Sequence, residues 1–202
     1  MPARLRVLVR QTPTGSTALR GCRPTPALRP LDAVHYPVLV TAASRHAATR
    51  EIAEAIAAGL VRRGIDAQAV AVEDVHELDE YSAVVLGSAV YLGRWLRPAM
   101  TFAAGNAALL QTMPVWLFSS GPLGPREHPL PATGPADVEE MMTLTGARMH
   151  RLFRGRLDRD SLGHAERIAV RAVHAPLGDG RDWREIDEFA ADIAGVLDPV
   201  TR

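Results

Sequence analysis

The sequence predicts an α/β fold in which helices cover both faces of a five-stranded parallel sheet. Two observations predict it: the strand segments are apolar throughout instead of alternating with polar residues, and a helical segment follows each of them. The chain of 202 residues is 47% hydrophobic and 23% charged, which is typical of one globular core.

The first strand and helix form the clearest unit. Residues 37–41 (PVLVT) have the pattern of a buried strand, and the small polar loop 42–48 leads into a helix. The helix has Glu51 near its positive N-terminal end and Gly64 after its last turn. Its apolar stripe consists of Ile52, Ala53, Ile56, Ala57 and Leu60.

The other strands and helices follow in alternation. The second helix is expected to begin near Arg94 with Pro98 in its first turn, and the last begins with a capping box of Asp182 and Glu185. Further strands are expected at residues 66–72, 83–87, 114–119 and 150–153, and a short helix at 138–144. The expected apolar face of the last helix comprises Trp183, Ile186, Ala190, Ile193 and Leu197.

Residues 1–35 differ from the rest of the chain. They carry six arginines against one aspartate, are rich in Pro, Thr and Gly, and show no periodicity, so we expect a disordered basic extension. A later start of translation, for instance at Val34, and a functional basic arm are the alternatives. The folded domain is expected to span residues 36–200.

Composition excludes several kinds of site. Lysine is absent, which excludes a P-loop lysine, a Schiff base and a pyridoxal phosphate site. Cys22 is the only cysteine, which excludes an internal disulfide, cysteine-ligated zinc and iron–sulfur clusters, and the histidines have no metal-ligand spacing. Redox chemistry therefore requires a bound organic cofactor. The zero net charge indicates no nucleic-acid partner, and the lack of a long apolar run or signal peptide predicts a cytoplasmic protein.

Three loops are candidates for a ligand site, because ligands of parallel α/β sheets lie outside the carboxyl ends of the strands. They are residues 41–49, 88–94 and 119–126. The first suits a phosphate, since it is rich in small residues and leads into a helix N-terminus with unpaired backbone N–H groups. Ser44 and Thr49 would add hydroxyl donors and Arg45 a charge; alternatively, the two hydroxyls only cap the helix.

Four phrases of the sequence resemble a known family. They are TAASRHAATREIA (41–53), GSAVYLGRW (87–95), FSSGPL (118–123) and GDGRDW (178–183). Their order and their places at strand ends are similar to those of the flavodoxin superfamily, in particular the quinone-linked protoporphyrinogen dehydrogenases and their actinobacterial flavodoxin-domain relatives. The resemblance covers residues 37–197 and implies a flavodoxin-like, doubly wound sheet with strand order 2-1-3-4-5.

The resemblance also implies an FMN site. Tyr91 would stack on the flavin ring, although a surface tyrosine is the alternative. Ser119, Ser120 and Gly121 would form the opposing wall, where backbone N–H groups bond the pyrimidine edge. The implied cofactor-binding residues are Ser44, Arg45, His46, Ala47, Ala48, Thr49, Ser88, Ala89, Val90, Tyr91, Leu92, Gly93, Ser119, Ser120 and Gly121.

Ala47 departs from the family phrase. Relatives typically read S-R-x-G-x-T-R-E-I-A here, with Gly where this chain has Ala47. If the position needs a positive φ or a close approach to the phosphate, the methyl group would weaken FMN binding or shift the loop. An alanine is tolerated where φ stays negative.

Other notable residues have structural interpretations. Trp95 is expected to pack at a helix start, Asp179 to orient its loop, Asp182 to act as an N-cap and His46 to be solvated. Seven arginines lie in residues 146–171, where they would attract porphyrin propionates or an anionic membrane surface, or simply form a solvated helix face.

Three functions fit these observations. The first is an FMN-dependent oxidoreductase similar to protoporphyrinogen dehydrogenase, acting on a porphyrinogen with a quinone acceptor and contacting the membrane surface peripherally. The second is a non-catalytic electron carrier, against which the zero net charge argues mildly. The third is a flavin-free binding module, suggested by Ala47.

Overall fold

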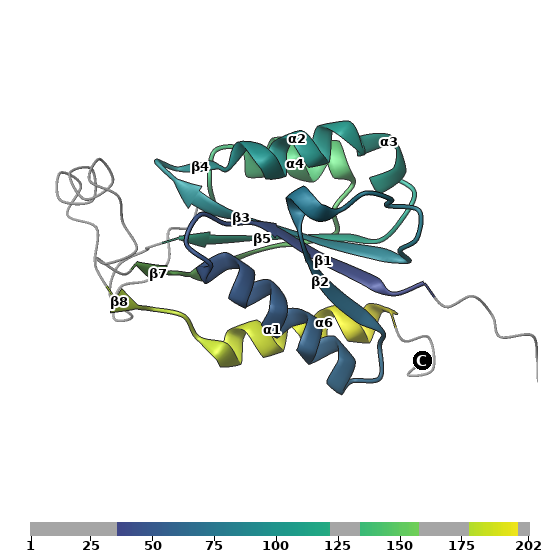
Figure 1. The fold of residues 1–202 in the computed structure, drawn as a ribbon, viewed down its shortest axis with the longest axis horizontal. Coiled ribbons are helices and arrows are strands. Elements are labelled where there is room, and N and C mark those ends of the chain that lie inside the picture. The colour runs from purple at the N-terminus through teal and green to yellow at the C-terminus, as the bar shows by residue number, and fades with distance from the viewer. Residues whose placement is uncertain (1–35, 122–133, 158–177, 198–202) are drawn as a thin grey trace, which may run out of the picture. The chain divides into compact units, whose positions relative to one another are not determined.

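The described part of the chain is one α/β unit. The computed structural model describes residues 36–121, 134–157 and 178–197. All of them belong to the compact unit Val34–Arg202, and the expected extension at residues 1–35 lies outside the described residues. A central sheet lies between two layers of helices (Figure 1).

The central sheet is parallel, as predicted. Its strands are β1 (Val38–Ala43), β2 (Ala67–Ala71), β3 (Ala83–Tyr91), β5 (Val115–Gly121) and β6 (His150–Arg154). They pair in the order β2-β1-β3-β5-β6. Counted along the chain without the short strand β4 (Arg94–Trp95), this is the predicted order 2-1-3-4-5. β4 is an addition that pairs antiparallel with the end of β3.

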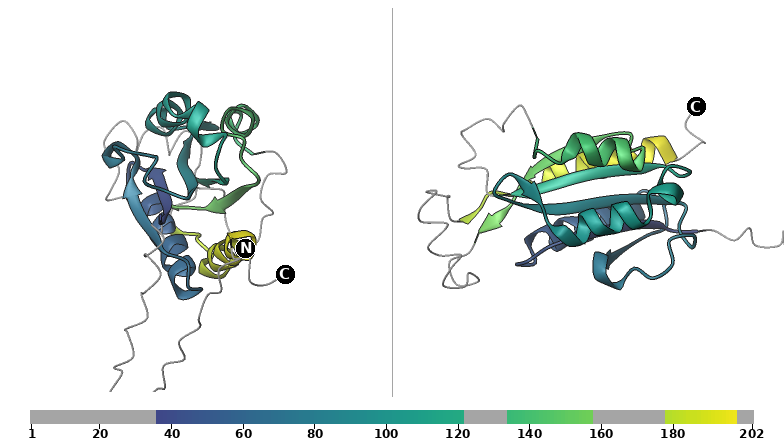
Figure 2. Two further views of the ribbon diagram at one scale, coloured as in Figure 1. Left: turned by 90° about the vertical axis from the view of Figure 1, so that its right-hand side faces the viewer. Right: turned by 90° about the horizontal axis from the view of Figure 1, so that it is seen from above.

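Helices cover both faces of the sheet, as Figure 2 shows. One face carries α1 (Ala48–Arg62) and α6 (Trp183–Leu197), and the other carries α2 (Arg97–Gly105), α3 (Ala107–Leu110) and α4 (Val138–Thr145). A 3₁₀ turn, η1 (Val72–Asp74), follows β2. A separate antiparallel pair consists of β7 (Arg156–Leu157) and β8 (Gly178–Asp179).

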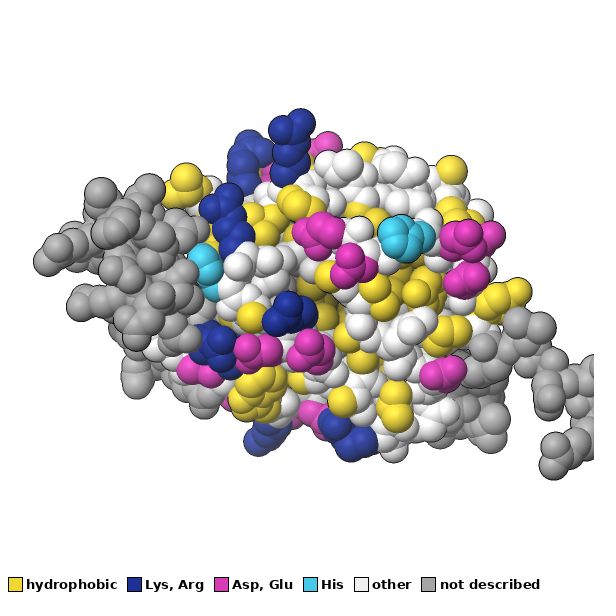
Figure 3. All heavy atoms as spheres, viewed as in Figure 1, with side chains coloured by type: hydrophobic (Ala, Val, Ile, Leu, Met, Phe, Trp, Pro, Cys, Tyr) yellow, Lys and Arg dark blue, Asp and Glu magenta, His cyan; other side chains and the backbone are white. Residues whose placement is uncertain are grey.

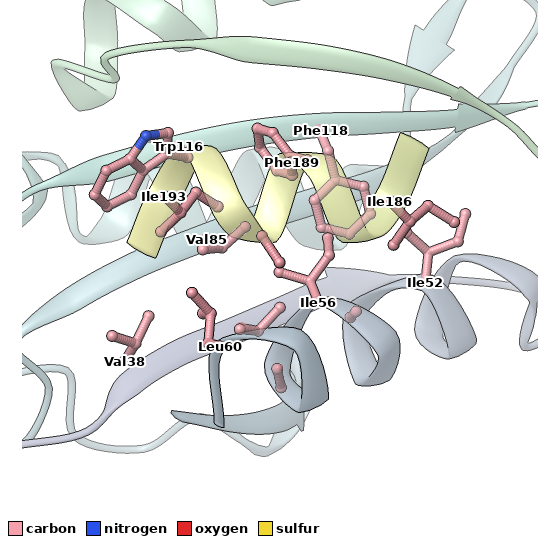
Figure 4. Close-up of a cluster of buried hydrophobic side chains, with 14 of the residues drawn as sticks. Val38, Ile52, Ile56, Leu60, Val85, Trp116, Phe118, Ile186, Phe189 and Ile193 are labelled. Carbon is pink, nitrogen blue, oxygen red and sulfur yellow. The ribbon is translucent and has the colours of Figure 1, made fainter. Parts of the chain in front are cut away.

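The core under α1 and α6 confirms the apolar stripe predicted for α1. Ile52, Ile56 and Leu60 are fully buried and point toward the sheet and α6 (Figure 4). On the α6 side the largest buried side chain is that of Phe189, which is not among the residues expected on the apolar face. Its ring lies edge-on to that of Phe153, with 5.6 Å between the centroids, so aromatic packing adds to the burial of apolar surface.

Two predictions about helix residues are wrong. Trp183 does not belong to the apolar face of α6: it is the first residue of the helix and is 47% exposed, lying under the Arg181 guanidinium. The second helix does not begin near Arg94. Residues 94–95 pair back onto β3 as β4, and α2 begins only at Arg97. Pro98 does lie in the first turn of α2, where its missing N–H removes no helical hydrogen bond.

The expected end signals of two helices are confirmed. Gly64 follows α1 with φ of 81°, a left-handed conformation that glycine adopts without strain. The Asp182 carboxylate accepts a hydrogen bond from the N–H of Arg184 at 3.0 Å, as an N-cap does. Arg62, the last residue of α1, and Arg63, which follows it, both donate to Asp187 of α6; these bonds join the two helices at the surface and lower the pKa of Asp187.

Candidate functional site at the strand ends

The carboxyl ends of β1, β3 and β5 lie side by side. Ala43 is in register with Ser88, and Ser88 with Ser119, so the three candidate loops leave the sheet at the same edge. The second and third segments also touch: a Cβ on Gly121 would lie 3.3 Å from the Cβ of Val90. The structure therefore brings the three predicted segments together.

Two of the predicted loops begin later than expected. β3 continues to Tyr91, so Ser88, Ala89, Val90 and Tyr91 are strand residues, and only Leu92 and Gly93 form the turn. β5 likewise continues through Ser119, Ser120 and Gly121. Pairing with β4 and with β6 extends these strands beyond the apolar runs that mark them in the sequence. Residues 122–126 lie outside the described part of the chain.

The first segment leads directly into α1. The helix begins at Ala48, has no side-chain hydrogen bond at its cap, and follows Ala47. Thr49 is buried inside the first turn, so the interpretation of Ser44 and Thr49 as helix caps is wrong. Among the described residues, the backbone N–H groups of Thr49 and Arg50 have no hydrogen-bond acceptor. These N–H groups and the helix dipole favour an anion at this end of α1.

Ala47 adopts the left-handed conformation, with φ of 60° and ψ of −21°. The position is therefore one that glycine fits without strain, and Cβ makes it unfavourable for alanine. Ala47 therefore has the positive φ at which a change from the family's Gly to Ala is expected to weaken FMN binding or shift the loop.

A hollow of about 370 Å³ opens beside this loop. Its lining combines small residues with cationic side chains and one carboxylate: Ala42, Ser44, Arg45, His46, Ala47, Arg50, Ala71 and Glu73. On the face seen in Figure 3, the Arg side chains lie in the left and middle parts, and the right-hand part shows none. The charge around this edge of the sheet suits an anionic ligand.

Tyr91 lies at the end of β3 and is half-buried. The guanidinium of Arg45 lies over its ring, 4.8 Å from the centroid. This cation–π contact connects the loop after β1 with the end of β3.

Hydrogen bonds to Asp137 hold the residues that follow the turn after Tyr91. Leu92 has φ of 50° and Gly93 φ of 76° in the tight hairpin between β3 and β4. The buried carboxylate of Asp137 accepts hydrogen bonds from the Arg94 guanidinium at 2.8 Å and from the Trp95 N–H at 2.9 Å. Leu92 itself is 89% exposed at the tip.

The hydroxyls of Ser88 and Ser119 form hydrogen bonds within the protein. Ser88 Oγ accepts the N–H of Leu96 at 2.9 Å. Ser119 Oγ accepts the indole N–H of Trp95 at 2.7 Å and lies 2.8 Å from Nε2 of His150. Burial lowers the pKa of His150 to about 4, so its ring is uncharged at neutral pH. These two serines can face a ligand only through their backbone.

A cluster of charged side chains that the sequence does not predict holds α1 against β7 and β8. We call Glu51, Arg156, Asp179 and Arg181 the arginine clasp. Arg181, 4% exposed, donates to Glu51 at 2.6 Å and to Asp179 at 2.7 and 2.9 Å. Arg156 donates to the same Glu51 carboxylate at 3.1 and 3.2 Å. Hydrogen bonding to Arg181 lowers the pKa of both carboxyls and raises that of the guanidinium.

The clasp joins two of the four phrases that carry the family resemblance. Glu51 belongs to the first phrase and Arg181 to the last, 130 residues later. Asp179 orients its own loop as expected, since its carboxylate also accepts the backbone N–H of Arg181 at 3.1 Å. The positions of Glu51 and Arg181 in the sequence do not predict that they pair. Their opposite charges are the only hint.

Part of the arginine-rich segment is described. Arg148, Arg151, Arg154 and Arg156 lie between α4 and β7, and residues 158–171 lie outside the described part. In the described residues, no group of three His, Cys, Asp or Glu side chains is arranged to hold a metal ion. None of the described helices has the length and apolarity that crossing a membrane requires.

Comparison with known proteins points to one family. The sequence model described as a flavodoxin domain matches residues 39–182. No curated protein matches the chain.

Solved structures share the fold at low sequence identity. A flavodoxin from the domain Archaea is 20% identical with a TM-score of 0.53, covering 80% of this chain and 98% of its own. The flavodoxin of Streptococcus pneumoniae TIGR4 is 17% identical with a TM-score of 0.52, covering 79% and 98%. The rubredoxin oxygen:oxidoreductase of Desulfovibrio gigas is 16% identical with a TM-score of 0.54, and the match covers 81% of this chain and 37% of that one.

Proposed function

Because the chain belongs to the flavodoxin-domain family, whose usual cofactor is FMN, we propose that it binds FMN and acts as an oxidoreductase. The observation that carries the proposal is the uncapped N-terminus of α1 beside the joined ends of β1, β3 and β5. It supports a ligand with an anionic group at one end and a flat ring at the other. FMN has this form.

The donor set at α1 fits the FMN phosphate. The N–H groups of Thr49 and Arg50, which have no acceptor among the described residues, would donate to it, and Arg45 would balance its charge. The ring would lie against Tyr91 and the backbone of residues 119–121. Bound FMN would supply the transfer of electrons or hydride, and the protein would position the ring and set its electrostatic surroundings.

For the substrate we propose a porphyrinogen, with a quinone as electron acceptor. The support is the resemblance of the four phrases to those of the protoporphyrinogen dehydrogenases. The test is oxidation of protoporphyrinogen by the FMN-loaded protein with menadione as acceptor. No turnover above free FMN would contradict this substrate while leaving the flavoprotein proposal intact.

A second candidate function is favoured by Ala47. Its left-handed conformation places strain in the loop that would cradle the phosphate, which fits a flavin-free binding module that has kept the fold. The purified protein distinguishes the two. A yellow preparation that releases FMN on denaturation supports the first proposal, and a colourless protein that does not quench FMN fluorescence on titration supports the second.

A further inference from the structure

Trp95 is joined to three neighbouring elements. It lies in β4, pairs with Val90 of β3 and is 4% exposed. Its backbone N–H donates at 2.9 Å to Asp137, the residue before α4. Its indole N–H donates at 2.7 Å to the hydroxyl of Ser119 in β5. Both N–H groups of this buried residue therefore have acceptors, which hold the side chain in one orientation.

The acceptor of the indole is fixed as well. Ser119 is fully buried, and its hydroxyl lies 2.8 Å from Nε2 of His150 in β6. The N–H of Leu96, the residue after Trp95, donates at 2.9 Å to the hydroxyl of Ser88 in β3. A chain of hydrogen bonds thus connects the β3–β4 hairpin through β5 to β6.

This chain joins the two walls proposed for the flavin ring. One wall is the end of β3 with Tyr91, in the hairpin that β4 closes, and the other is the backbone of residues 119–121 in β5. A hydrogen bond is directional and weakens when it is bent or stretched. The bond from the Trp95 indole to Ser119 therefore limits both the separation and the sliding of the two walls.

We infer that Trp95 is a positioning residue of the ring site, whose indole hydrogen bond holds the Tyr91 hairpin at the distance from β5 that a flat ring requires. The inference rests on the FMN binding proposed above. Because its side chain is buried, Trp95 acts on the ring through Tyr91 and the backbone of β5. Walls that already have the required spacing bind a ring more tightly, since binding then involves no ordering of them.

Trp95→Phe tests the inference, because it keeps an aromatic side chain but removes the indole N–H. The ligands are FMN and riboflavin, which carries the same ring without the phosphate. Fluorescence titration gives the dissociation constants, and visible circular dichroism reports the surroundings of the bound ring. We expect both dissociation constants to rise about fivefold, the effect of one neutral hydrogen bond, and the circular dichroism of the bound flavin to change.

Trp116→Phe is the matched control. Trp116 of β5 is 1% exposed and lies in the core under α1 and α6 (Figure 4). Within the described part of the chain its indole makes no hydrogen bond. The substitution should lower the melting temperature and leave both dissociation constants unchanged. The two variants together separate the loss of a buried tryptophan from the loss of the hydrogen bond.

Ser119→Ala removes the acceptor of the same bond and provides a second measurement. It should weaken the binding of both flavins at least as much as Trp95→Phe does. The double variant should bind no more weakly than Ser119→Ala alone, because both changes break one bond.

Three results would overturn the inference. They are unchanged dissociation constants in Trp95→Phe, an equal rise in Trp116→Phe, or a rise for FMN without one for riboflavin, which would place the effect at the phosphate end. If Trp95→Phe does not fold, Ser119→Ala decides by the same criteria. The proposal of FMN binding fails separately, if the wild-type protein binds neither flavin.

Discussion

Ala47 and Leu92 are the two non-glycine residues with positive φ in the described part of the chain. Both lie in segments at the carboxyl edge of the sheet. A left-handed conformation costs a residue with a Cβ roughly 1–2 kcal/mol, and such strain gathers at functional sites. The two strained residues thus lie at the same edge of the sheet as the aligned strand ends and the arginine-lined hollow.

Replacing Ala47 by Gly should stabilise the protein by about 1 kcal/mol, because glycine adopts φ of 60° without strain. It should also tighten FMN several-fold if this loop holds the phosphate. Thermal unfolding and fluorescence titration measure the two effects. Ala58→Gly, at an exposed position inside α1, is the control and should instead destabilise by about 1 kcal/mol. Unchanged FMN affinity in Ala47→Gly would contradict the assignment of the loop.

Protonation of His150 should lower the free energy of unfolding at acidic pH. The pKa of its ring is about 4 in the folded protein against 6.5 in the unfolded chain, so the unfolded chain takes up the proton first. Its contribution is complete above pH 6.5 and is lost as the pH falls toward 4. We expect a loss on the order of 2 kcal/mol, reduced from the full value by the partial exposure of the ring.

The matched variant is His150→Gln, which offers Ser119 a hydrogen-bonding group that does not titrate. Urea unfolding at pH 7 and at pH 4.5 measures both proteins. The wild type should lose more stability than the variant between the two pH values. Equal losses would mean that His150 does not carry the effect.

At the scale of elements, the arginine clasp attaches the β7–β8 pair to the first turn of α1. Arg181→Met would leave the carboxylates of Glu51 and Asp179 without their main partner. Because Arg181 is buried while the carboxylates are partly exposed, we expect a loss of about 2 kcal/mol. Denaturant unfolding measures it.

Arg184 provides the control for the clasp. Its ion pair with Glu188 lies on the surface, with the Arg184 side chain 87% exposed, so Arg184→Met should cost less than about 0.5 kcal/mol. Equal losses in the two variants would show that the clasp contributes no more than a surface pair.

At the scale of the whole molecule, stability depends on the two cores that the sheet separates. Phe189 is fully buried between α6 and the sheet, so Phe189→Ala should destabilise the protein by about 3–5 kcal/mol. Val196→Ala on the same helix, where the side chain is 45% exposed, should cost less than about 1 kcal/mol. Calorimetry of both variants tests the prediction, and similar melting temperatures would contradict the packing.

Much of the fold could be predicted because parallel strands and amphipathic helices have local signatures. Apolar runs such as residues 83–87 and the stripe of Ile52, Ile56 and Leu60 report burial directly. The predictions were wrong where pairing with a neighbouring strand, and not composition, decides the length of a strand. β3 and β5 extend past their apolar runs, and Arg94 and Trp95 form a strand only because β3 is beside them.

The sequence by itself determined the class of fold, the order of its strands through family resemblance, and the edge where the three segments meet. Only the tertiary structure decided that Ala47 is left-handed, that the hydroxyls of Ser88 and Ser119 face inward, and that Glu51 meets Arg181. The physical reason is range: periodicity records which residues are buried, whereas backbone angles and hydrogen-bond partners depend on groups up to 130 residues away.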